Sequence, residues 1–361
     1  MAPRIFITGA TGLIGGDFLH ILVEKHPDWE IVVLVRDVRK ISLLRTNYPT
    51  VEIIPGSLDD VDLLEQESSK SDVVLNFANC DHLPAAEAII RGLARRKEQG
   101  TVIHTSGAKI IAWEMEAQPS NWGQLIPRYY NDLEGVAELT SLPSAADPEP
   151  TGYDHVLPNW AAHRNVDMAI LRGRGHPQIR TVIVCPPTVY GPSRFPGFTR
   201  SIQVPRLLNV MLRRRRAFTI HGNENRWHMV HTQDIARMYL LLTEAAVDEH
   251  SPRELWNEHG YFFAENGEFA WGDVIRRLAQ LGYQRGWLDS PEAEDLPNHV
   301  VQRFWYGGQM NVSSTSLGVA RRAREMLGWT PMEADIFSDL ERMLDVEATL
   351  LWLRSEAGSP F

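Results

Sequence analysis

The feature that most constrains the fold lies at the start of the chain, where a short apolar run leads into closely spaced glycines. Residues 5–7 read as a buried strand, and Gly9, Gly12 and Gly15 follow in the pattern G-x-x-G-x-x-G before a helical stretch, 15–25. The first glycine permits a tight turn, the second lets a diphosphate approach the backbone, and the third lets the helix pack closely on the strand. The free amides of the first helical turn then face the phosphates. This arrangement predicts a dinucleotide-binding unit, with a purely structural turn as the alternative.

Apolar runs and helical patterns alternate through the first half of the chain, and this alternation predicts an α/β fold. Near-continuous apolar strands separated by helices form a parallel sheet that is covered on both faces. Right-handed crossovers then bring the carboxyl ends of the strands, and any ligand, to one edge of the sheet. We expect strands at 30–35, 51–54, 72–78, 101–105 and 179–184, and helices at 39–46, 59–69, 84–98 and 159–172.

The rest of the chain has a different texture, with proline-rich loops between shorter elements. The segment 112–158 is rich in Pro, Ser, Asn and Trp and holds one helical piece at 132–139, so we expect it to line a cleft. The run 232–234, Thr-Gln-Asp, is typical of a helix N-terminus. Later helices are expected at 205–216, 232–243, 271–282 and 335–353, with another that follows Ser313–Ser316 and ends at Leu327.

Composition argues against several classes of function. The net charge of −10 disfavours nucleic acid as a partner, because a phosphate backbone attracts a basic face. The run 213–216 of four arginines is read as the solvated end of a helix, with an anion contact as the alternative. Two cysteines give no disulfide framework, and His228 and His231 lack a third ligand at useful spacing, so no metal is expected. Without a membrane-length apolar run or a signal peptide, the protein is expected in the cytoplasm, without membrane partners.

Five segments, in the same order along the chain, resemble the extended short-chain dehydrogenase/reductase superfamily, and the likeness is closest to its atypical epimerase-like members from filamentous fungi. The resemblance implies an α/β fold with a doubly wound Rossmann sheet that binds NAD(P), and a small discontinuous C-terminal substrate domain. We place the Rossmann domain at 1–191 and 227–263, and the substrate domain at 192–226 and 264–361. The five segments are Thr8–Gly15, Asp72–Ala78, Pro187–Pro192, His228–Ala236 and Leu327–Pro331.

The resemblance also implies which residues contact the cofactor. They belong to the glycine-rich turn, to the ends of the strands that follow it, and to the segment around Pro187. The expected set is Gly9, Thr11, Gly12, Leu13, Ile14, Gly15, Arg36, Lys40, Ser57, Leu58, Phe77, Ala78, Asn79, Thr105, Arg164, Pro187 and Val189.

The residues after the second strand favour NADP over NAD. An acidic residue at the strand end would accept both ribose hydroxyls and repel a 2′-phosphate. Here the strand ends in Arg36, which can clamp a phosphate with two hydrogen bonds, and Lys40 can add a point charge. Solvated charges at a strand end are the alternative interpretation, which leaves NAD as the less favoured cofactor.

The expected catalytic residues of the superfamily are largely missing. Its members reduce carbonyls with a Tyr-x-x-x-Lys pair on one helix and a nearby Ser or Thr. Aligning Asp167 with the family's downstream acid puts Trp160 at the tyrosine and Arg164 at the lysine, and tryptophan cannot shuttle a proton. Shifting the register by one residue gives Asn159 and His163, which restores neither group. The usual serine position falls on or beside Gly107, which leaves Ser106 or Thr105 as candidates for its role.

Three hypotheses of function follow from this departure. The first is carbonyl or imine reduction of a bulky, partly aromatic secondary-metabolite-like molecule with another proton donor. The second is redox-neutral isomerisation, cyclisation or dehydration, and the third is a non-catalytic dinucleotide sensor. A small-molecule substrate is the expected partner, and a homodimer is left open. Catalytic candidates are Ser106, Tyr130, Asp132, His163 and Arg164, and pocket candidates are Lys109, Tyr129, Trp160, Tyr190 and Trp227.

Overall fold

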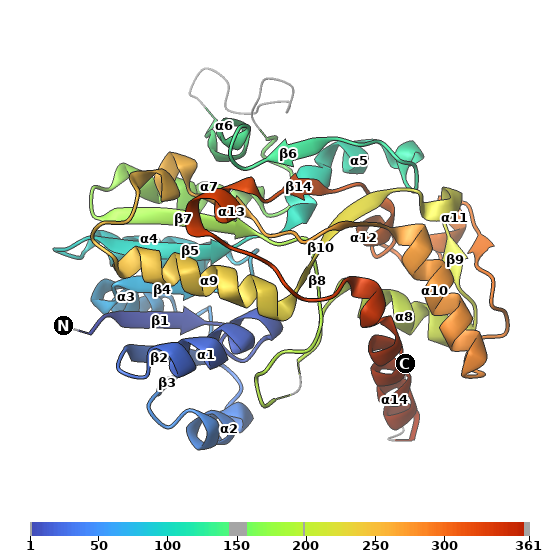
Figure 1. Cartoon of the computed structure of the whole chain (residues 1–361), viewed down its shortest axis with the longest axis horizontal. Helices are drawn as coiled ribbons and strands as arrows, with labels where there is room; N and C mark the ends of the chain where they lie inside the picture. The colour runs from blue at the N-terminus through green and yellow to red at the C-terminus, as the bar shows by residue number, and fades with distance from the viewer. Residues whose placement is uncertain (1, 144–156, 198, 357–361) are drawn as a thin grey trace.

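The computed structural model describes residues 2–143, 157–197 and 199–356, and its centre is a seven-stranded parallel sheet (Figure 1). The strand order is β11-β7-β5-β4-β1-β2-β3, and every neighbouring pair is parallel. The predicted doubly wound α/β fold is therefore confirmed. The strands are β1 (Arg4–Thr8), β2 (Glu30–Val35), β3 (Glu52–Pro55), β4 (Val73–Asn76), β5 (Gly100–Thr105), β7 (Ile179–Cys185) and β11 (Tyr261–Phe263).

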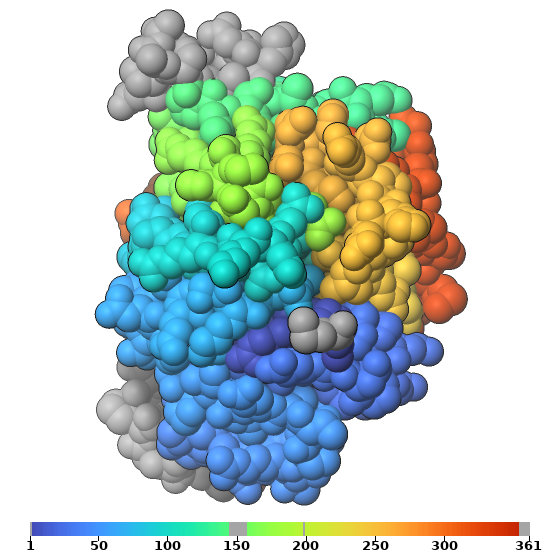
Figure 2. Space-filling model, turned by 90° about the vertical axis from the view of Figure 1, so that its left-hand side faces the viewer, coloured from blue at the N-terminus to red at the C-terminus, as the bar shows by residue number. Residues whose placement is uncertain are grey.

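Helices cover both faces of this sheet, as the apolar strands require. On one face α1 (Leu13–Lys25) packs against α9 (Thr232–Val247), and on the other α4 (Leu83–Ala94) packs against α3 (Val61–Lys70) and α7 (Arg164–Arg172). The helix α2 (Arg39–Asn47) connects β2 to β3. Figure 2 shows the side of the molecule at which the sheet strands begin. The segments there follow one another from blue through cyan and green to gold, in the order of the strands in the sheet.

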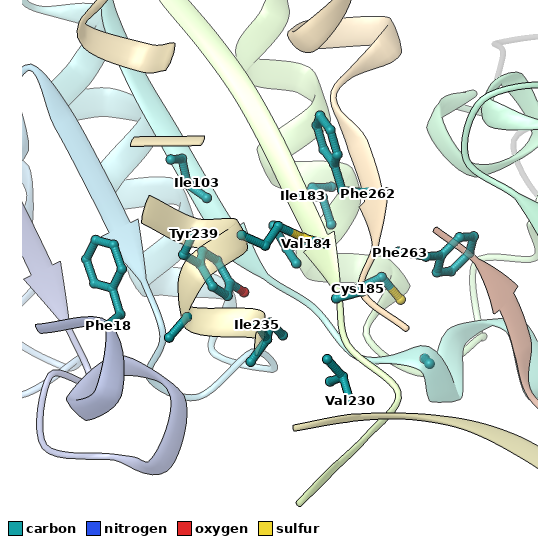
Figure 3. Close-up of a cluster of buried hydrophobic side chains, with 14 of the residues drawn as sticks. Phe18, Ile103, Ile183, Val184, Cys185, Val230, Ile235, Tyr239, Phe262 and Phe263 are labelled. Atoms are coloured by element: carbon teal, nitrogen blue, oxygen red, sulfur yellow. The ribbon is translucent and has the colours of Figure 1, made fainter. Parts of the chain in front are cut away.

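Aromatic side chains pack together with aliphatic ones between the sheet and the α1–α9 pair (Figure 3). Tyr239 of α9 makes edge contacts with Phe18 of α1 and with Phe77 after β4, at ring-centroid distances of 6.3 and 4.6 Å. Its hydroxyl lies 2.6 Å from Thr105 Oγ1 at the end of β5, so the one polar atom of this ring is satisfied. This packing fixes the carboxyl ends of β1, β4 and β5 relative to one another.

A smaller set of sheets and helices lies beyond the carboxyl ends of the strands (Figure 1). The predicted domain boundaries stay a prediction. The small sheets are β12-β10-β8, β13-β9 and β14-β6, built from β6 (Tyr129–Asn131), β8 (Thr188–Tyr190), β9 (Phe218–Thr219), β10 (Arg226–His231), β12 (Glu268–Ala270), β13 (Glu294–Asp295) and β14 (Leu317–Val319). The helices are α5 (Trp113–Ala117), α6 (Val136–Thr140), α8 (Gln203–Arg214), α10 (Trp271–Gln284), α11 (Asn298–Val301), α12 (Met310–Ser313), α13 (Arg321–Leu327) and α14 (Leu340–Glu356).

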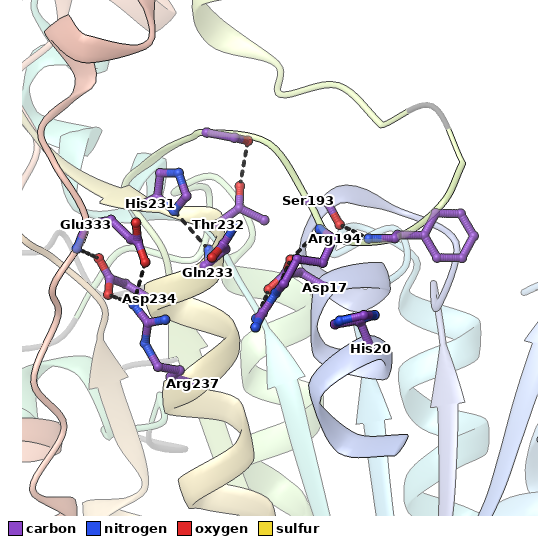
Figure 4. A network of polar contacts seen from close by, with 12 residues as sticks. Asp17, His20, Ser193, Arg194, His231, Thr232, Gln233, Asp234, Arg237 and Glu333 are labelled. Carbon is purple, nitrogen blue, oxygen red and sulfur yellow. Dashed lines mark hydrogen bonds and ion pairs between the residues drawn. The ribbon is translucent and has the colours of Figure 1, made fainter. Parts of the chain in front are cut away.

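A polar network joins the small sheets to α9 and α1 (Figure 4). The helix α9 begins at Thr232 as predicted, but its cap is His231 rather than the Thr-Gln-Asp run, since His231 Nδ1 accepts the Gln233 amide. Asp234 in the first turn accepts the amides of Met332 and Glu333, which ties the later chain to the helix. No helix in the described ranges is both long and apolar enough to cross a membrane.

One local prediction needs correction. The helix expected at 159–172 begins only at Arg164, because His163 adopts a left-handed backbone (φ 66°) that ends the preceding turn. The run 213–216 lies at the exposed end of α8 as predicted, and Arg215 and Arg216 there pair with Asp289 and Glu294. Much of the predicted cleft segment is described, but its residues 144–156 lie outside the described ranges.

Candidate active site

The glycine-rich turn between β1 and α1 has no room for side chains. Gly9 has φ 76°, and a Cβ there would lie 2.7 Å from the Ala78 amide nitrogen. A Cβ on Gly15 would lie 2.5 Å from the Gly9 carbonyl oxygen and 3.1 Å from Phe77 Cβ. Gly12 is the N-cap of α1 and offers no side chain to the first-turn amides. The turn thus presents free backbone donors, as a dinucleotide diphosphate requires.

The charges after β2 are arranged around this turn. Lys40 Nζ donates to the Thr11 carbonyl at 3.1 Å, so Lys40 closes over the glycine-rich loop. Arg36 is exposed at the end of β2. The acid next to Arg36 in sequence, Asp37, pairs with Arg39 at 2.8 Å, and that guanidinium lowers the pKa of Asp37 to about 2. The Asp37 carboxylate is therefore ionised, and its negative charge is balanced by the cation beside it.

The other predicted cofactor contacts lie at the same sheet edge. The backbone of Phe77 and Ala78 touches the glycine turn, while the Phe77 ring turns into the core. The Ser57 amide is held by Asp60 Oδ2 at 2.6 Å. The Thr105 hydroxyl forms a hydrogen bond with the Tyr239 hydroxyl. The remaining contacts of the predicted cofactor set stay predictions.

His163 lies beside the loop after β4, at the start of α7. Its Nδ1 lies 2.6 Å from Asp81 Oδ1 and 3.4 Å from Cys80 Sγ. Its Nε2 lies 3.0 Å from the position that a Cβ would occupy on Gly107. The missing side chain at 107, where the superfamily places its serine, is thus the space into which the imidazole points.

The hydrogen bonds of His163 define what it can do chemically. In the neutral ring, an Nδ1–H that donates to the Asp81 carboxylate leaves Nε2 as a hydrogen-bond acceptor and base. The imidazole side chain is 16% exposed and Asp81 faces solvent, so the pair can exchange protons with water. This geometry favours the register that places His163, rather than Arg164, at the functional position.

The same residues are the one group of metal-ligand types that converges in the described ranges. The donor atoms of Cys80, Asp81 and His163 all lie within 4.8 Å of one another. Two ligands of a tetrahedral zinc ion, each about 2.1 Å from the metal, lie roughly 3.3 Å apart. The 2.6 Å contact between His163 and Asp81 is too short for such a pair and fits a hydrogen bond.

An ion pair and two tryptophans lie near this site, and Glu116 of the ion pair interacts electrostatically with His163. Trp160 is 55% exposed and its ring meets the buried Trp113 edge-on at 5.9 Å. Lys109 Nζ lies 3.3 Å from Glu116 Oε1. Next to these residues, a cavity of about 270 Å³ is lined by Ile111, Glu114, Met115, Ile126, Arg128 and Thr315, among others.

The structure corrects the prediction for Arg164. Its side chain is fully buried, and its guanidinium donates to the carbonyl of Leu139 in α6 and to that of Ser141 directly after this helix. Arg164 therefore anchors the irregular segment to α7, and neither the catalytic nor the cofactor role predicted for it is supported by these contacts.

Two further catalytic candidates have structural partners. Asp132 accepts backbone amides from Phe263, Arg321 and Arg322, so it caps α13 and joins it to β11. The Tyr130 hydroxyl is buried and accepts the indole N–H of Trp113 at 3.0 Å. Burial raises the pKa of both side chains, that of Asp132 to about 6. Neither group points to the site around His163.

The predicted pocket residues divide in the same way. Tyr190 donates to the Ala334 carbonyl at 2.5 Å, and Trp227 donates to the Ser314 carbonyl at 2.6 Å, so both are interior anchors rather than pocket walls. Tyr129 is exposed and donates to Glu268. Lys109 and Trp160 remain as candidates at the site.

Sequence reasoning missed Cys80 and Asp81, although a signal was present. Both follow β4 directly, and the carboxyl ends of parallel strands carry the ligand-facing residues of this fold. Glu116 was also missed, because the short helix α5 gave no usable periodicity.

The fold and the site together define an NAD(P)-binding enzyme class, the extended short-chain dehydrogenases/reductases. The model of the NmrA-like family matches residues 1–101, and that of the NAD dependent epimerase/dehydratase family matches residues 157–257. The chain is 30% identical to the oxidase ucsJ of Acremonium sp. over 98% of its own length and 100% of that protein. The chain therefore belongs to the NmrA-like, NAD-dependent epimerase/dehydratase branch of the superfamily, and membership supports an NAD(P) dinucleotide as cofactor.

More distant relatives agree with this assignment. An uncharacterized protein of Schizosaccharomyces pombe is 26% identical over 93% of this chain and 98% of its own. The crystal structure of the PbgP3 protein from Burkholderia pseudomallei superposes with a TM-score of 0.65 over 98% of this chain and 99% of that one, at 14% identity. UDP-glucose 4-epimerase from Thermotoga maritima gives 0.58 over 96% and 99%, also at 14% identity. These two structures bear on the fold alone.

Proposed function

We propose that this protein is an NADP(H)-dependent oxidoreductase that moves a hydride between the nicotinamide and a carbon atom bonded to oxygen or nitrogen in a bulky small molecule. The observation that carries the proposal is the continuity of one sheet edge. The glycine turn contacts Phe77 and Ala78. The chain continues from there to Cys80 and Asp81, whose side chains contact His163. The glycine turn and the His163–Asp81 pair therefore border the same loop after β4.

His163 and Asp81 take over part of the work of the absent tyrosine and lysine. With Nδ1 bound to Asp81, the neutral ring presents Nε2 as a base that binds the hydroxyl or amine of a reduced substrate. In the reverse direction the protonated ring donates to the carbonyl or imine. General acid–base groups of this kind contribute about 10²–10⁴-fold to rate. The name of the relative ucsJ, an oxidase, supports redox chemistry over the redox-neutral and sensor hypotheses.

The preference for NADP rests on the charges after β2. Arg36 is exposed where the adenosine ribose is expected, and Lys40 already lies over the glycine loop. Asp37, which would repel a 2′-phosphate, is neutralised by Arg39. Arginine binds phosphate with two parallel hydrogen bonds, which suits this role.

The substrate is a bulky, partly aromatic molecule that stacks on the exposed Trp160. The adjoining cavity mixes apolar walls with the Glu114–Arg128 pair, which suits a ligand with an apolar body and few polar groups. A role in secondary metabolism in the cytoplasm fits this proposal, with the protein acting on its own or as a homodimer.

A cofactor titration and a substitution at His163 test the proposal. Quenching of tryptophan fluorescence should show NADPH binding, and His163→Gln should retain that binding while losing about 100-fold or more in kcat, because only proton exchange is removed. His176→Gln is the matched control and should leave kcat unchanged, because this exposed histidine lies between α7 and β7, at the other end of α7 from His163. Turnover without net oxidation of NADPH would instead support the isomerase hypothesis, and His163→Gln with full activity would exclude the assigned role.

A further inference from the structure

A second cluster of ionisable groups lies beneath His163, sealed inside the protein. Asp167 is in the first turn of α7, His104 is in β5, and Ser106 follows β5 directly. The side chains of His104 and Asp167 have no exposure, and Ser106 is 4% exposed. The mechanism proposed above uses none of the three.

Hydrogen bonds fix the protonation of His104. Thr8 Oγ1 donates to Asn76 Oδ1 at 2.6 Å, so the Asn76 amide Nδ2 donates to His104 Nδ1 at 3.1 Å. Nδ1 is therefore an acceptor, and the ring carries its hydrogen on Nε2. Burial lowers the pKa of His104 to about 3, so the ring is neutral. It cannot serve as a cation for Asp167.

Asp167 has one strong partner. Its Oδ2 accepts the Ser106 hydroxyl at 2.9 Å. Its Oδ1 faces His104 Nε2 at 3.8 Å, and neither of these atoms has a hydrogen-bond partner in the described part of the chain. Arg164, the nearest permanent cation on α7, directs its guanidinium to Leu139 and Ser141 instead.

Such a carboxyl is poised between its two protonation states. Burial without a paired cation disfavours the anion, while the hydroxyl of Ser106 favours it. The net result raises the pKa of Asp167 to about 7. The titratable or charged groups facing Asp167 are His163 and Arg164 on α7, His104 on β5, Cys80 and Asp81 after β4, Cys185 on β7 and Tyr261 on β11.

We propose that Ser106 and Asp167 form a second proton-exchange unit of the active site, in which Ser106 touches the reacting heteroatom and Asp167 stores the proton behind it. This inference rests on the proposed function. Ser106 is the catalytic residue of the unit because its hydroxyl bonds to the buried carboxyl and its neighbour in sequence, Gly107, borders His163. Asp167 acts only through Ser106 and is a positioning residue.

The step balances for carbonyl reduction. Bound NADPH would supply the hydride to the substrate carbon, and the π pair would move to oxygen. That oxygen, which accepts a hydrogen bond from His163, takes the Ser106 proton, and Ser106 Oγ takes the carboxyl proton of Asp167. The products are NADP⁺, the alcohol and the Asp167 carboxylate, which regains a proton from water through Ser106 after release. Oxidation follows the same path in reverse.

Infrared spectroscopy of the free, full-length protein tests the store without a substrate. A protonated carboxyl gives a C=O band that the carboxylate lacks, so a difference titration follows Asp167 directly. We expect a band that disappears as the pH rises through neutrality, that is absent in Asp167→Asn, and that persists in Asp132→Asn. Asp132 is the matched control because it is also buried with a raised pKa but caps α13 instead.

Ser106→Ala provides an independent variant that conserves the buried carboxyl. Removing the donor to the anion should move the titration of the band to higher pH. It should also slow single-turnover NADPH oxidation by phenanthrenequinone, a bulky aromatic carbonyl probe, by about 100-fold. NADPH binding should be unchanged in both variants.

Three results would overturn the inference. One is a wild-type difference spectrum with no carboxyl band titrating near neutrality, and another is a band that Asp167→Asn leaves in place. The third is a pH–rate profile for the probe that Ser106→Ala does not alter. Failure of the proposed function looks different, because the band would titrate as expected while NADPH does not bind.

Discussion

At the scale of single residues, the position of His163 depends on the missing side chain at Gly107. Gly107 has no side chain, and the imidazole of His163 points into the volume that a side chain there would fill. His163 is held in a left-handed backbone conformation, which costs a non-glycine residue about 1–3 kcal/mol and persists where the surroundings enforce it. The contacts to Cys80 and Asp81 provide that enforcement.

Arg36 carries the prediction that belongs to this scale. Arg36→Asp should weaken NADPH binding by about 10–100-fold and favour NADH, because a phosphate loses a charge-assisted clamp and gains a repelling carboxylate. Isothermal titration of both cofactors measures the change. Arg45→Asp, at an exposed arginine in the last turn of α2, is the control for net charge and should leave the NADPH-to-NADH ratio alone. An unchanged ratio in Arg36→Asp would locate the discrimination elsewhere.

At the scale of elements, the long apolar strands and the helices with a regular pattern could be predicted from the sequence, and the very short strands could not. The strands of the parallel sheet are long apolar runs, and α9 announces itself with His231 and the residues that follow. Strands such as β12 and β14 have three residues each, too few to show alternation. The expectation that both members of the Tyr-x-x-x-Lys register share one helix does not hold here, because α7 begins at Arg164 and residues 159 and 160 precede it.

Side-chain roles depended on partners that are distant in sequence. Asp132 bonds to amides almost 190 residues further along, and Arg164 bonds to carbonyls in an irregular segment. Local patterns carry no information about such partners. The glycine turn, in contrast, is local in sequence and in space, and its role could be inferred from the spacing of the residues alone.

The close approach of α1 to β1 and β4 gives the prediction at this scale. Gly15→Ala should lower both the melting temperature and NADPH affinity, because the new Cβ would lie 2.5 Å from a backbone oxygen that cannot give way. Overpacking of this kind costs about 1–3 kcal/mol. Gly175→Ala introduces the same methyl where nothing lies within 4 Å and should be neutral. Thermal unfolding with and without NADPH separates stability from binding.

At the scale of the whole molecule, the segment between β8 and α8 contacts α1, the first helix of the Rossmann fold (Figure 4). The Arg194 amide and guanidinium both bind the fully buried carboxylate of Asp17 on α1, each at 2.6 Å. Phe195 lies against Gly16, and its ring stacks with Tyr48 at 6.4 Å. This clasp joins residues 177 apart in sequence and holds the later part of the chain against the cofactor-binding helix.

Breaking the clasp should be costly. Arg194→Ala leaves the Asp17 carboxylate buried without its cation, and such a loss typically costs about 3–5 kcal/mol in the free energy of unfolding. Arg39→Ala, which removes an exposed pair with Asp37, should cost far less, because water screens the charges of an exposed pair. Urea unfolding measures both. Adding Asp17→Asn to Arg194→Ala should recover part of the loss, and no recovery would contradict the buried-charge explanation.

The chain of buried polar groups from Thr8 through Asn76 to His104 has an evolutionary consequence. Thr8 donates to Asn76 and Asn76 donates to His104, so replacing one member alone strands a buried donor or acceptor at a cost of about 1–3 kcal/mol. Lineages descending from this protein would have to exchange these positions as a set or keep them all. The first member adjoins the glycine turn and the last lies beneath His163, so inheritance couples the two ends of the site even where the substrate changes.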